Sequence, residues 1–175
     1  MKRFNAAAKL TAGLIFSTVF LVACGGGGDD GNGGGGDPAD VPLSQAPALV
    51  QQYAAEFNAA RAVPRSCGGQ AMPAVQPLSK WNPKLQASAQ AHADDMTAKG
   101  YYSHVRQDGK SEVDYGYTGM PTAENLMKGS SSTSPVRHVE IWLDSPGHCV
   151  AIMNELSKTV AVARSGVYTV MVYGN

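Results

Sequence analysis

Apolar residues at helical spacing define a first predicted helix near residue 50. Its apolar positions are Leu49, Tyr53, Phe57 and Ala60, three or four residues apart, and Pro64 follows them. Residues at this spacing share one face of an α-helix, and proline interrupts a helix because it has no N–H group to donate. The pattern therefore predicts an amphipathic helix that ends before Pro64.

A second predicted helix has recognisable residues at both ends. Asn82 is a residue type that caps helix N-termini, and Pro83 fits the first helical position. Gly100 is suited to stop the helix. The apolar stripe between these ends consists of Leu85, Ala89, His92 and Met96. His92 is therefore expected to pack inside the protein with one hydrogen bond.

Two further helices are expected before residue 155. The third opens with Ser134-Pro135, carries Val139 and Trp142 on one face, and ends before Pro146. The fourth is a short segment over residues 149–154.

The last part of the chain changes to the period-two pattern of strands. The runs TVAVAR (159–164) and VYTVMVYG (167–174) are rich in β-branched and aromatic residues, and Ser165-Gly166 separates them as a compact turn. Tyr101 and Tyr102 are expected to begin a short strand or turn. Helices followed by a closing hairpin predict an α+β domain with its helices packed on a sheet.

The N-terminus has the organisation of a signal peptide, predicted over residues 1–23. Lys2 and Arg3 precede the apolar run LTAGLIFSTVFLVA (10–23), which is short for a membrane-spanning helix. The run ends in Leu21-Val22-Ala23-Cys24, which resembles the lipobox of bacterial lipoproteins. The resemblance implies a diacylglycerol-modified Cys24 that anchors the chain to a membrane. The alternative is an ordinary secretory signal followed by an incidental cysteine.

A glycine-rich tract follows Cys24. The sequence GGGGDDGNGGGGDPAD (25–40) cannot bury apolar surface, so residues 24–43 are expected to form a lipidated, flexible tether, with a folded domain over 44–175. This organisation predicts location at a bacterial cell envelope. Gly25 differs from the aspartate that retains lipoproteins at the inner membrane, which favours the outer membrane in a host with two.

The charge balance becomes mildly acidic once the N-terminus is set apart. Lys2, Arg3 and Lys9 precede Cys24, and every acidic residue follows it, so 11 basic and 14 acidic residues remain. A charge of about −3 without a basic patch excludes nucleic acid as an expected partner.

Two cysteines remain if Cys24 is lipidated. Cys67 and Cys149 would lie in an oxidising compartment and are expected to form a disulfide. Two separate buried thiols are the alternative, and a reactive cysteine nucleophile would require Cys149 to be free.

Two of the four histidines follow predicted turns. His104 follows the stop of the second helix, and His148 follows Ser145-Pro146-Gly147, whereas His138 is expected on the surface of the third helix. Imidazoles with nearby carboxylates suit zinc or another divalent cation. The sequence contains neither H-E-x-x-H nor C-x-x-C, and the absence of G-x-S-x-G argues against a serine hydrolase.

Four segments in a fixed order carry a resemblance to a known family. They are PLSKWNPKLQASAQAHADDMTAKGYYSH (77–104), DGKS (108–111), AENL (123–126) and IWLDSPGHCVAIMN (141–154). Their order resembles the CAP superfamily, also called SCP-like, which includes cysteine-rich secretory proteins, antigen 5 and pathogenesis-related protein 1. The resemblance covers residues 49–174 and implies an α-β-α sandwich with a central antiparallel sheet and a large cleft.

The same resemblance implies a set of cleft residues. Two histidines and two glutamates line the cleft in this family, and in several members they bind zinc or another divalent cation. His104, Glu124 and His148 match three of these positions. The usual position of the second glutamate holds Ser145, so Glu140 or Asp144 is the candidate for the fourth ligand.

Three functions are compatible with this resemblance. The first is a non-catalytic binding module with no catalytic residue, whose cleft takes a lipid or other small molecule, with a divalent cation as the expected cofactor. The second is a zinc-dependent hydrolase in which Glu124 activates water. The third is a cell-envelope interaction protein with a vestigial cleft. In each case the Cys67–Cys149 disulfide is expected to hold His148 in the cleft.

Overall fold

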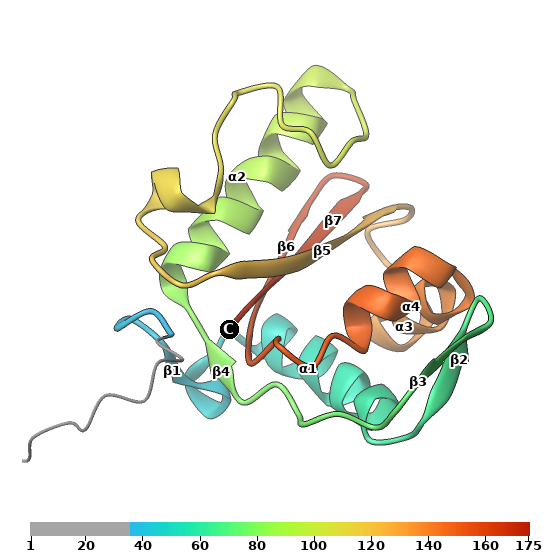
Figure 1. Cartoon of the computed structure of the whole chain (residues 1–175). Coiled ribbons are helices and arrows are strands. Elements are labelled where there is room, and N and C mark those ends of the chain that lie inside the picture. Colours follow the sequence, from blue (N-terminus) through green and yellow to red (C-terminus); the bar gives the residue numbers. More distant parts are fainter. Residues whose placement is uncertain (1–35) are drawn as a thin grey trace, which may run out of the picture. The chain divides into compact units, whose positions relative to one another are not determined.

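A five-stranded sheet is the middle layer of this computed structural model, which describes residues 36–175 (Figure 1). Its strand order is β1-β4-β6-β7-β5, and only the β4–β6 pair is parallel. The strands are β1 (Val41–Pro42), β4 (Lys80–Trp81), β5 (Pro121–Lys128), β6 (Thr159–Ser165) and β7 (Tyr168–Gly174). The predicted signal peptide, Cys24 and the tether up to residue 35 lie outside the described residues.

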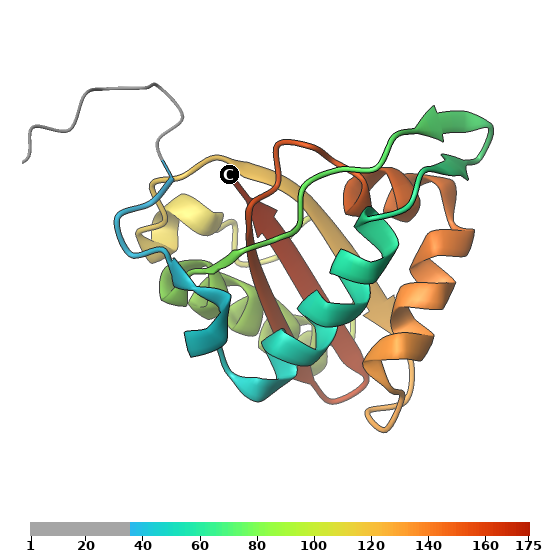
Figure 2. The same cartoon turned by 90° about the horizontal axis from the view of Figure 1, so that it is seen from below.

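Helices cover both faces of the sheet, as Figure 2 shows. Helix α2 (Pro83–Lys99) covers one face, and α1 (Ala48–Arg61), α3 (Pro135–Asp144) and α4 (Pro146–Ile152) cover the other. Alternate residues of β6 and β7 supply the two hydrophobic cores. Val160, Val162, Met171 and Tyr173 pack with α1, α3 and α4, whereas Ala161, Ala163, Val170 and Val172 pack with α2. The expected α-β-α sandwich is confirmed.

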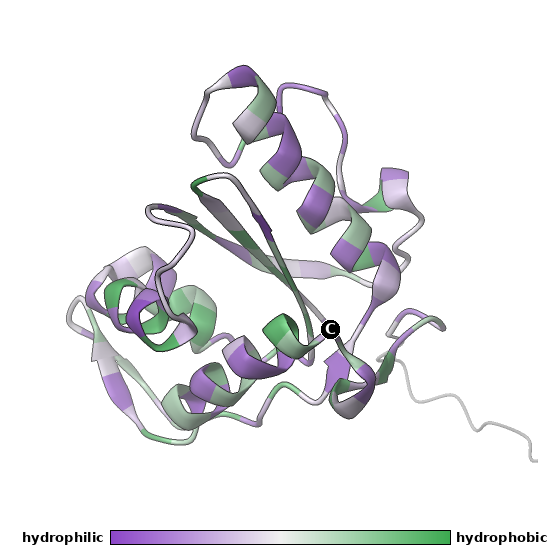
Figure 3. Cartoon of the chain, turned by 180° about the vertical axis from the view of Figure 1, so that it is seen from behind, coloured by the Kyte–Doolittle hydropathy of each residue, from purple (hydrophilic) through white to green (hydrophobic). Residues whose placement is uncertain are grey.

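The helix ends follow from local hydrogen bonding. The Asn82 side chain accepts hydrogen bonds from the backbone N–H groups of Lys84 and Leu85, and Gly100 ends α2 with a φ of 71°. Ser134 caps α3 by accepting from the Arg137 N–H group. Hydrophobic and hydrophilic residues alternate along the helices, in keeping with one buried and one exposed face (Figure 3).

The fourth helix differs in its bounds from the sequence prediction. It spans Pro146–Ile152, so it begins three residues before Cys149. Pro146 is tolerated at this position because the first N–H groups of a helix have no partner within the helix. His148 is therefore part of a helix and not of a loop.

Two other segments also differ from expectation. Tyr101 and Tyr102 form no strand; their hydroxyls donate to Asp95 and to the Leu126 carbonyl. Strand β5 was not expected, and it forms the sheet edge beside β7. Its Glu124-Asn125 pair is polar because each side chain has polar partners in the folded protein.

Packed structure begins before Ser44, within the expected tether. Asp37 is 2% exposed, and its carboxylate accepts hydrogen bonds from the Thr118 N–H and hydroxyl and from the Ala39 N–H. Lys84 forms an ion pair with it at 3.3 Å. Strand β1 then pairs with β4. Residues 36–43 are thus part of the domain.

A disulfide joins Cys67 to Cys149, as predicted. Cys67 ends strand β2 (Arg65–Cys67), which forms a separate hairpin with β3 (Gln70–Met72). The bridge ties this hairpin to α4 next to His148. Within residues 36–175, no helix has the length and apolar character required to cross a membrane.

Candidate functional site

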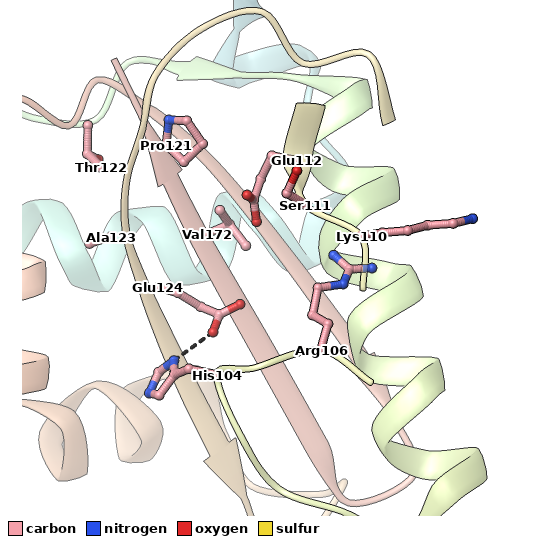
Figure 4. A pocket seen from close by; sticks show the side chains of 10 residues that line it. All are labelled: His104, Arg106, Lys110, Ser111, Glu112, Pro121, Thr122, Ala123, Glu124 and Val172. Atoms are coloured by element: carbon pink, nitrogen blue, oxygen red, sulfur yellow. Dashed lines mark hydrogen bonds and ion pairs between the residues drawn. The ribbon is translucent and has the colours of Figure 1, made fainter. Parts of the chain in front are cut away.

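A cavity of about 430 Å³ lies between β5 and the segment that follows α2 (Figure 4). His104 and Arg106 line one side, Thr122 and Glu124 of β5 line the other, and Val172 of β7 contributes from the sheet. Glu124 pairs with Val172 across the two strands, which directs both side chains to the face covered by α2. The cavity therefore opens at the sheet edge on the α2 side.

Glu124 is the central polar group of this cavity. One carboxylate oxygen, Oε1, lies 2.7 Å from His104 Nδ1, and the other, Oε2, lies 3.1 Å from His92 Nδ1. Both oxygens are therefore engaged by imidazole rings. The Glu124–His104 pair was expected from the family resemblance, and the structure brings these two side chains together.

His92 is a site residue that the sequence interpretation missed. It lies on the buried face of α2 with 1% exposure, and its Nε2 lies 3.0 Å from the Ser103 carbonyl oxygen. It therefore makes two hydrogen bonds, where one was expected. Its partners lie 11 and 32 residues away, so no local pattern in the sequence indicates them.

His148 lies on α4 in the opposite helix layer and is not among the residues that line this cavity. Burial lowers the pKa of its imidazole, and the charge of nearby His104 lowers it further. The neutral form is therefore favoured, which is the form that binds metals or accepts a hydrogen bond. Asn125 donates to the His148 carbonyl at 3.4 Å and to the Tyr173 hydroxyl at 3.3 Å.

The AENL segment thus contacts both of the histidines that the resemblance assigned to the cleft, from one strand. Glu124 faces α2 and holds His104, whereas Asn125 faces the other layer and contacts the backbone of His148. The carbonyl of Leu126 accepts from the Tyr102 hydroxyl and from the Trp142 indole, so side chains of both layers meet over the outer edge of β5.

Of the three acidic residues considered as ligands, two have partners within the protein and the third is exposed. Glu124 is engaged by two histidines, and Glu140 is 54% exposed and pairs with Arg137 at 2.9 Å. Asp144 is exposed at the end of α3. Between residues 36 and 175, no three His, Cys, Asp or Glu side chains are grouped so that they could hold an ion. The metal site expected at His104, Glu124 and His148 stays a prediction.

The lining of the cavity combines charged side chains of both signs with apolar groups. Arg106 pairs with Asp108 at 3.3 Å and donates to Ser88 and Tyr115, which fixes its guanidinium beside the opening. Pro121, Ala123 and Val172 supply apolar groups to the lining. Val105, Val113 and Met120 are exposed apolar residues that adjoin lining residues in the sequence. The cavity can therefore accommodate a ligand that has both polar and apolar parts.

Comparisons with known proteins identify a family and two similar solved structures. The profile of the Cysteine-rich secretory protein family, CAP, matches residues 54–173. No curated protein matches the chain significantly. An extracellular protein from Bacillus anthracis that contains an SCP domain is similar in structure, with 19% identity, a TM-score of 0.48, and coverage of 59% of this chain and 34% of that protein.

An outer surface protein from Borrelia burgdorferi is also similar, with 19% identity, a TM-score of 0.44, and coverage of 54% of this chain and 75% of that protein. The chain spans about a third of the length of the Bacillus protein. The family match covers most of the chain and includes both cleft histidines and Glu124. The chain therefore belongs to the cysteine-rich secretory protein (CAP) family.

Proposed function

We propose that this protein is a non-catalytic binding module whose cleft takes a small ligand at the bacterial cell envelope. The observation that carries the proposal is the double engagement of Glu124 by His92 and His104. A carboxylate held on both oxygens orients its partners and is poorly available to take a proton from water. Glu124 therefore serves to arrange the cleft.

The proposed ligand has a polar group joined to an apolar part, as a lipid does. The polar group would reach His104 and Thr122 within the cavity. The apolar part would lie on the exposed side chains of Val105, Val113 and Met120, whose sequence neighbours line the cavity. Burial of one such exposed side chain against a ligand contributes on the order of 1 kcal/mol.

Dihexanoylphosphatidylglycerol, used below its micellar concentration, is a suitable probe for this class of ligand. Titration of the purified protein by calorimetry should give saturable binding. Val113→Glu should weaken it about tenfold because a carboxylate at the rim repels the phosphate and replaces apolar contact. Val63→Glu is the matched control, since Val63 is similarly exposed outside the cavity lining. Absence of binding, or equal weakening by both variants, would contradict the proposal.

Attachment to the envelope is part of the proposal and rests on residues 1–24. Two or three acyl chains on Cys24 would anchor the protein stably, whereas one chain would bind only marginally. A disulfide within the domain agrees with an oxidising compartment. Mass spectrometry of the membrane fraction should find the acyl mass on the wild-type protein and not on Cys24→Ala. An unmodified wild-type protein in the medium would refute the anchor.

A zinc-dependent hydrolase is the second candidate, favoured by the His104–Glu124 contact. Metal-ligating histidines commonly donate a hydrogen bond to a carboxylate through the N–H of the ring nitrogen that does not bind the metal. Nδ1 of His104 is in contact with the Glu124 carboxylate in this way. Calorimetric zinc titration of the purified protein, alongside His104→Ala and His148→Ala, tests this candidate. Tight binding lost in both variants, with zinc-dependent casein hydrolysis, would favour the hydrolase over the binding module.

A further inference from the structure

Both ring nitrogens of His92 lie within hydrogen-bond distance of an oxygen atom. Its Nε2 lies 3.0 Å from the Ser103 carbonyl oxygen, and its Nδ1 lies 3.1 Å from Glu124 Oε2. The Nδ1 contact joins His92 and Glu124 into a pair. With 1% of His92 exposed, water cannot replace either partner. The pair is therefore a fixed connection between α2 and β5.

This connection determines which oxygen of Glu124 remains for the cleft. Helix α2 packs on β6 and β7, whereas Glu124 lies on the edge strand β5. His92 therefore holds the carboxylate from the more deeply packed element. With Oε2 engaged by His92, Oε1 is directed at His104 Nδ1 at 2.7 Å.

His104 depends on this carboxylate for its orientation. Its side chain is 58% exposed and lies in an irregular segment, so neighbouring packing restrains it little. A neutral imidazole in water favours the tautomer with hydrogen on Nε2. A hydrogen bond from Nδ1 to Glu124 selects the opposite tautomer, because the proton must lie between the ring and the carboxylate.

We propose that His92 is a positioning residue that holds Glu124 so that His104 keeps its proton on Nδ1 and presents the bare Nε2 lone pair to the cleft. The bare nitrogen accepts a hydrogen bond, so the ligand class is one that brings a donor, such as the hydroxyls of a glycerol or sugar headgroup or a protonated amine. This assignment rests on the proposed binding function and specifies which polar group the cleft recognises.

Imidazole nitrogen NMR tests the assignment without any ligand. Two-bond proton–nitrogen correlation spectra of the purified protein at pH 8 distinguish protonated from bare ring nitrogens. In the wild type, His104 should show a protonated Nδ1 and a bare Nε2. His92→Phe and Glu124→Ala should each shift the population so that most of His104 carries its proton on Nε2.

A conservative variant and a matched control separate positioning from general disruption. His92→Gln retains an N–H donor toward Glu124 and should preserve the wild-type tautomer of His104. His138→Phe removes the other buried histidine, which contacts Tyr53 instead of Glu124, and should also leave the tautomer unchanged. If His92→Phe does not fold, the wild-type and Glu124→Ala spectra can still overturn the tautomer assigned to His104, and a folded His92→Leu protein replaces His92→Phe as the test of His92.

The assignment is wrong if His104 of the wild type carries its proton on Nε2. It is also wrong if Glu124→Ala or His92→Phe folds and leaves the tautomer of His104 unchanged. The two proposals fail separately. If the titration detects no binding of dihexanoylphosphatidylglycerol, the proposed function is wrong and the tautomer result is unaffected. A wrong tautomer would remove the role of His92 and leave any measured binding intact.

Discussion

Arg61 offers a quantitative test of how the two ends of the α1 layer are held together. It is fully buried on α1, and burial lowers the pKa of its guanidinium. The side chain donates five hydrogen bonds, all to backbone carbonyls. The acceptors are Gln76 at 2.9 and 2.7 Å, Ile152 at 2.6 Å, Asn154 at 3.0 Å and Ser157 at 3.1 Å. One guanidinium thereby fixes α1 to the segment after β3 and to the loop between α4 and β6.

Arg61→Lys keeps the charge and most of the stem, but the ammonium is a point donor that cannot span this arrangement. At least two of the four carbonyl groups would lose their partner. Each buried group left unpaired costs about 1–3 kcal/mol. We therefore expect a loss of about 3 kcal/mol in the free energy of unfolding, a large part of the 5–15 kcal/mol typical of a domain.

Urea unfolding followed by tryptophan fluorescence measures this loss, with Trp81 and Trp142 as probes. With a slope of about 2 kcal/mol per molar urea, the midpoint should fall by about 1.5 M. Arg137→Lys is the matched control, because Arg137 is 61% exposed and its one ion pair within residues 36–175 is with Glu140 on α3. It should change stability by less than about 0.5 kcal/mol. Equal midpoints for the two variants would refute the reasoning that the carbonyls depend on the guanidinium.

Three further predictions concern covalent and titrating groups. Replacing both cysteines, Cys67→Ala with Cys149→Ala, removes a disulfide between residues 82 positions apart. The chain-entropy model gives a loss of about 4.5 kcal/mol in the free energy of unfolding, and measured losses usually lie at about 2–4 kcal/mol. A loss of less than about 1 kcal/mol in urea unfolding would contradict this prediction. Burial raises the pKa of Asp37, but hydrogen bonds from Thr118 and Ala39 outweigh this and lower it below its usual value. The ionised Asp37 therefore contributes its full stabilisation of the folded protein above about pH 4 and less in stronger acid. Asp37→Asn should lower the melting temperature at pH 7, and the difference in melting temperature from the wild type should become smaller toward pH 2. Burial, followed by the charge of Arg164, lowers the pKa of His138 to about 4. As the pH falls, the unfolded chain protonates His138 before the folded protein does, so the free energy of unfolding should fall by a few kcal/mol between about pH 6.5 and 4. A folded His138→Gln protein whose melting temperature changes with pH as steeply as that of the wild type would refute this assignment.

The sequence predicted those elements whose causes are local. The apolar stripe and the end residues predict α2 from a few neighbouring positions, and the β-branched and aromatic runs predict β6 and β7 in the same way. All three elements formed as expected. Strand β5 was missed because it is an edge strand beside a polar cavity. Glu124 faces the cleft, and Asn125 is buried against the Tyr173 hydroxyl, so the hydrophobic alternation is interrupted at both positions.

The site was predicted in part for the same reason. The family resemblance identified His104, Glu124 and His148, and the first two are in contact. His92 occupies a position in an apolar stripe, where a packed histidine and a site histidine look alike in sequence. Only the approach of β5 to α2 reveals its role. Asp37 was assigned to the tether on composition, because its partner Thr118 lies 81 residues away.

The order of the strands also has a consequence for the time at which this fold can form. The two central strands, β6 and β7, follow all four helices of the described chain. As the chain leaves the ribosome N-terminus first, the apolar faces of the helices therefore emerge before the sheet that will cover them. Contacts over long sequence separations form slowly. We therefore expect the fold to be completed only after residues 159–174 have emerged, with apolar helix faces exposed until then.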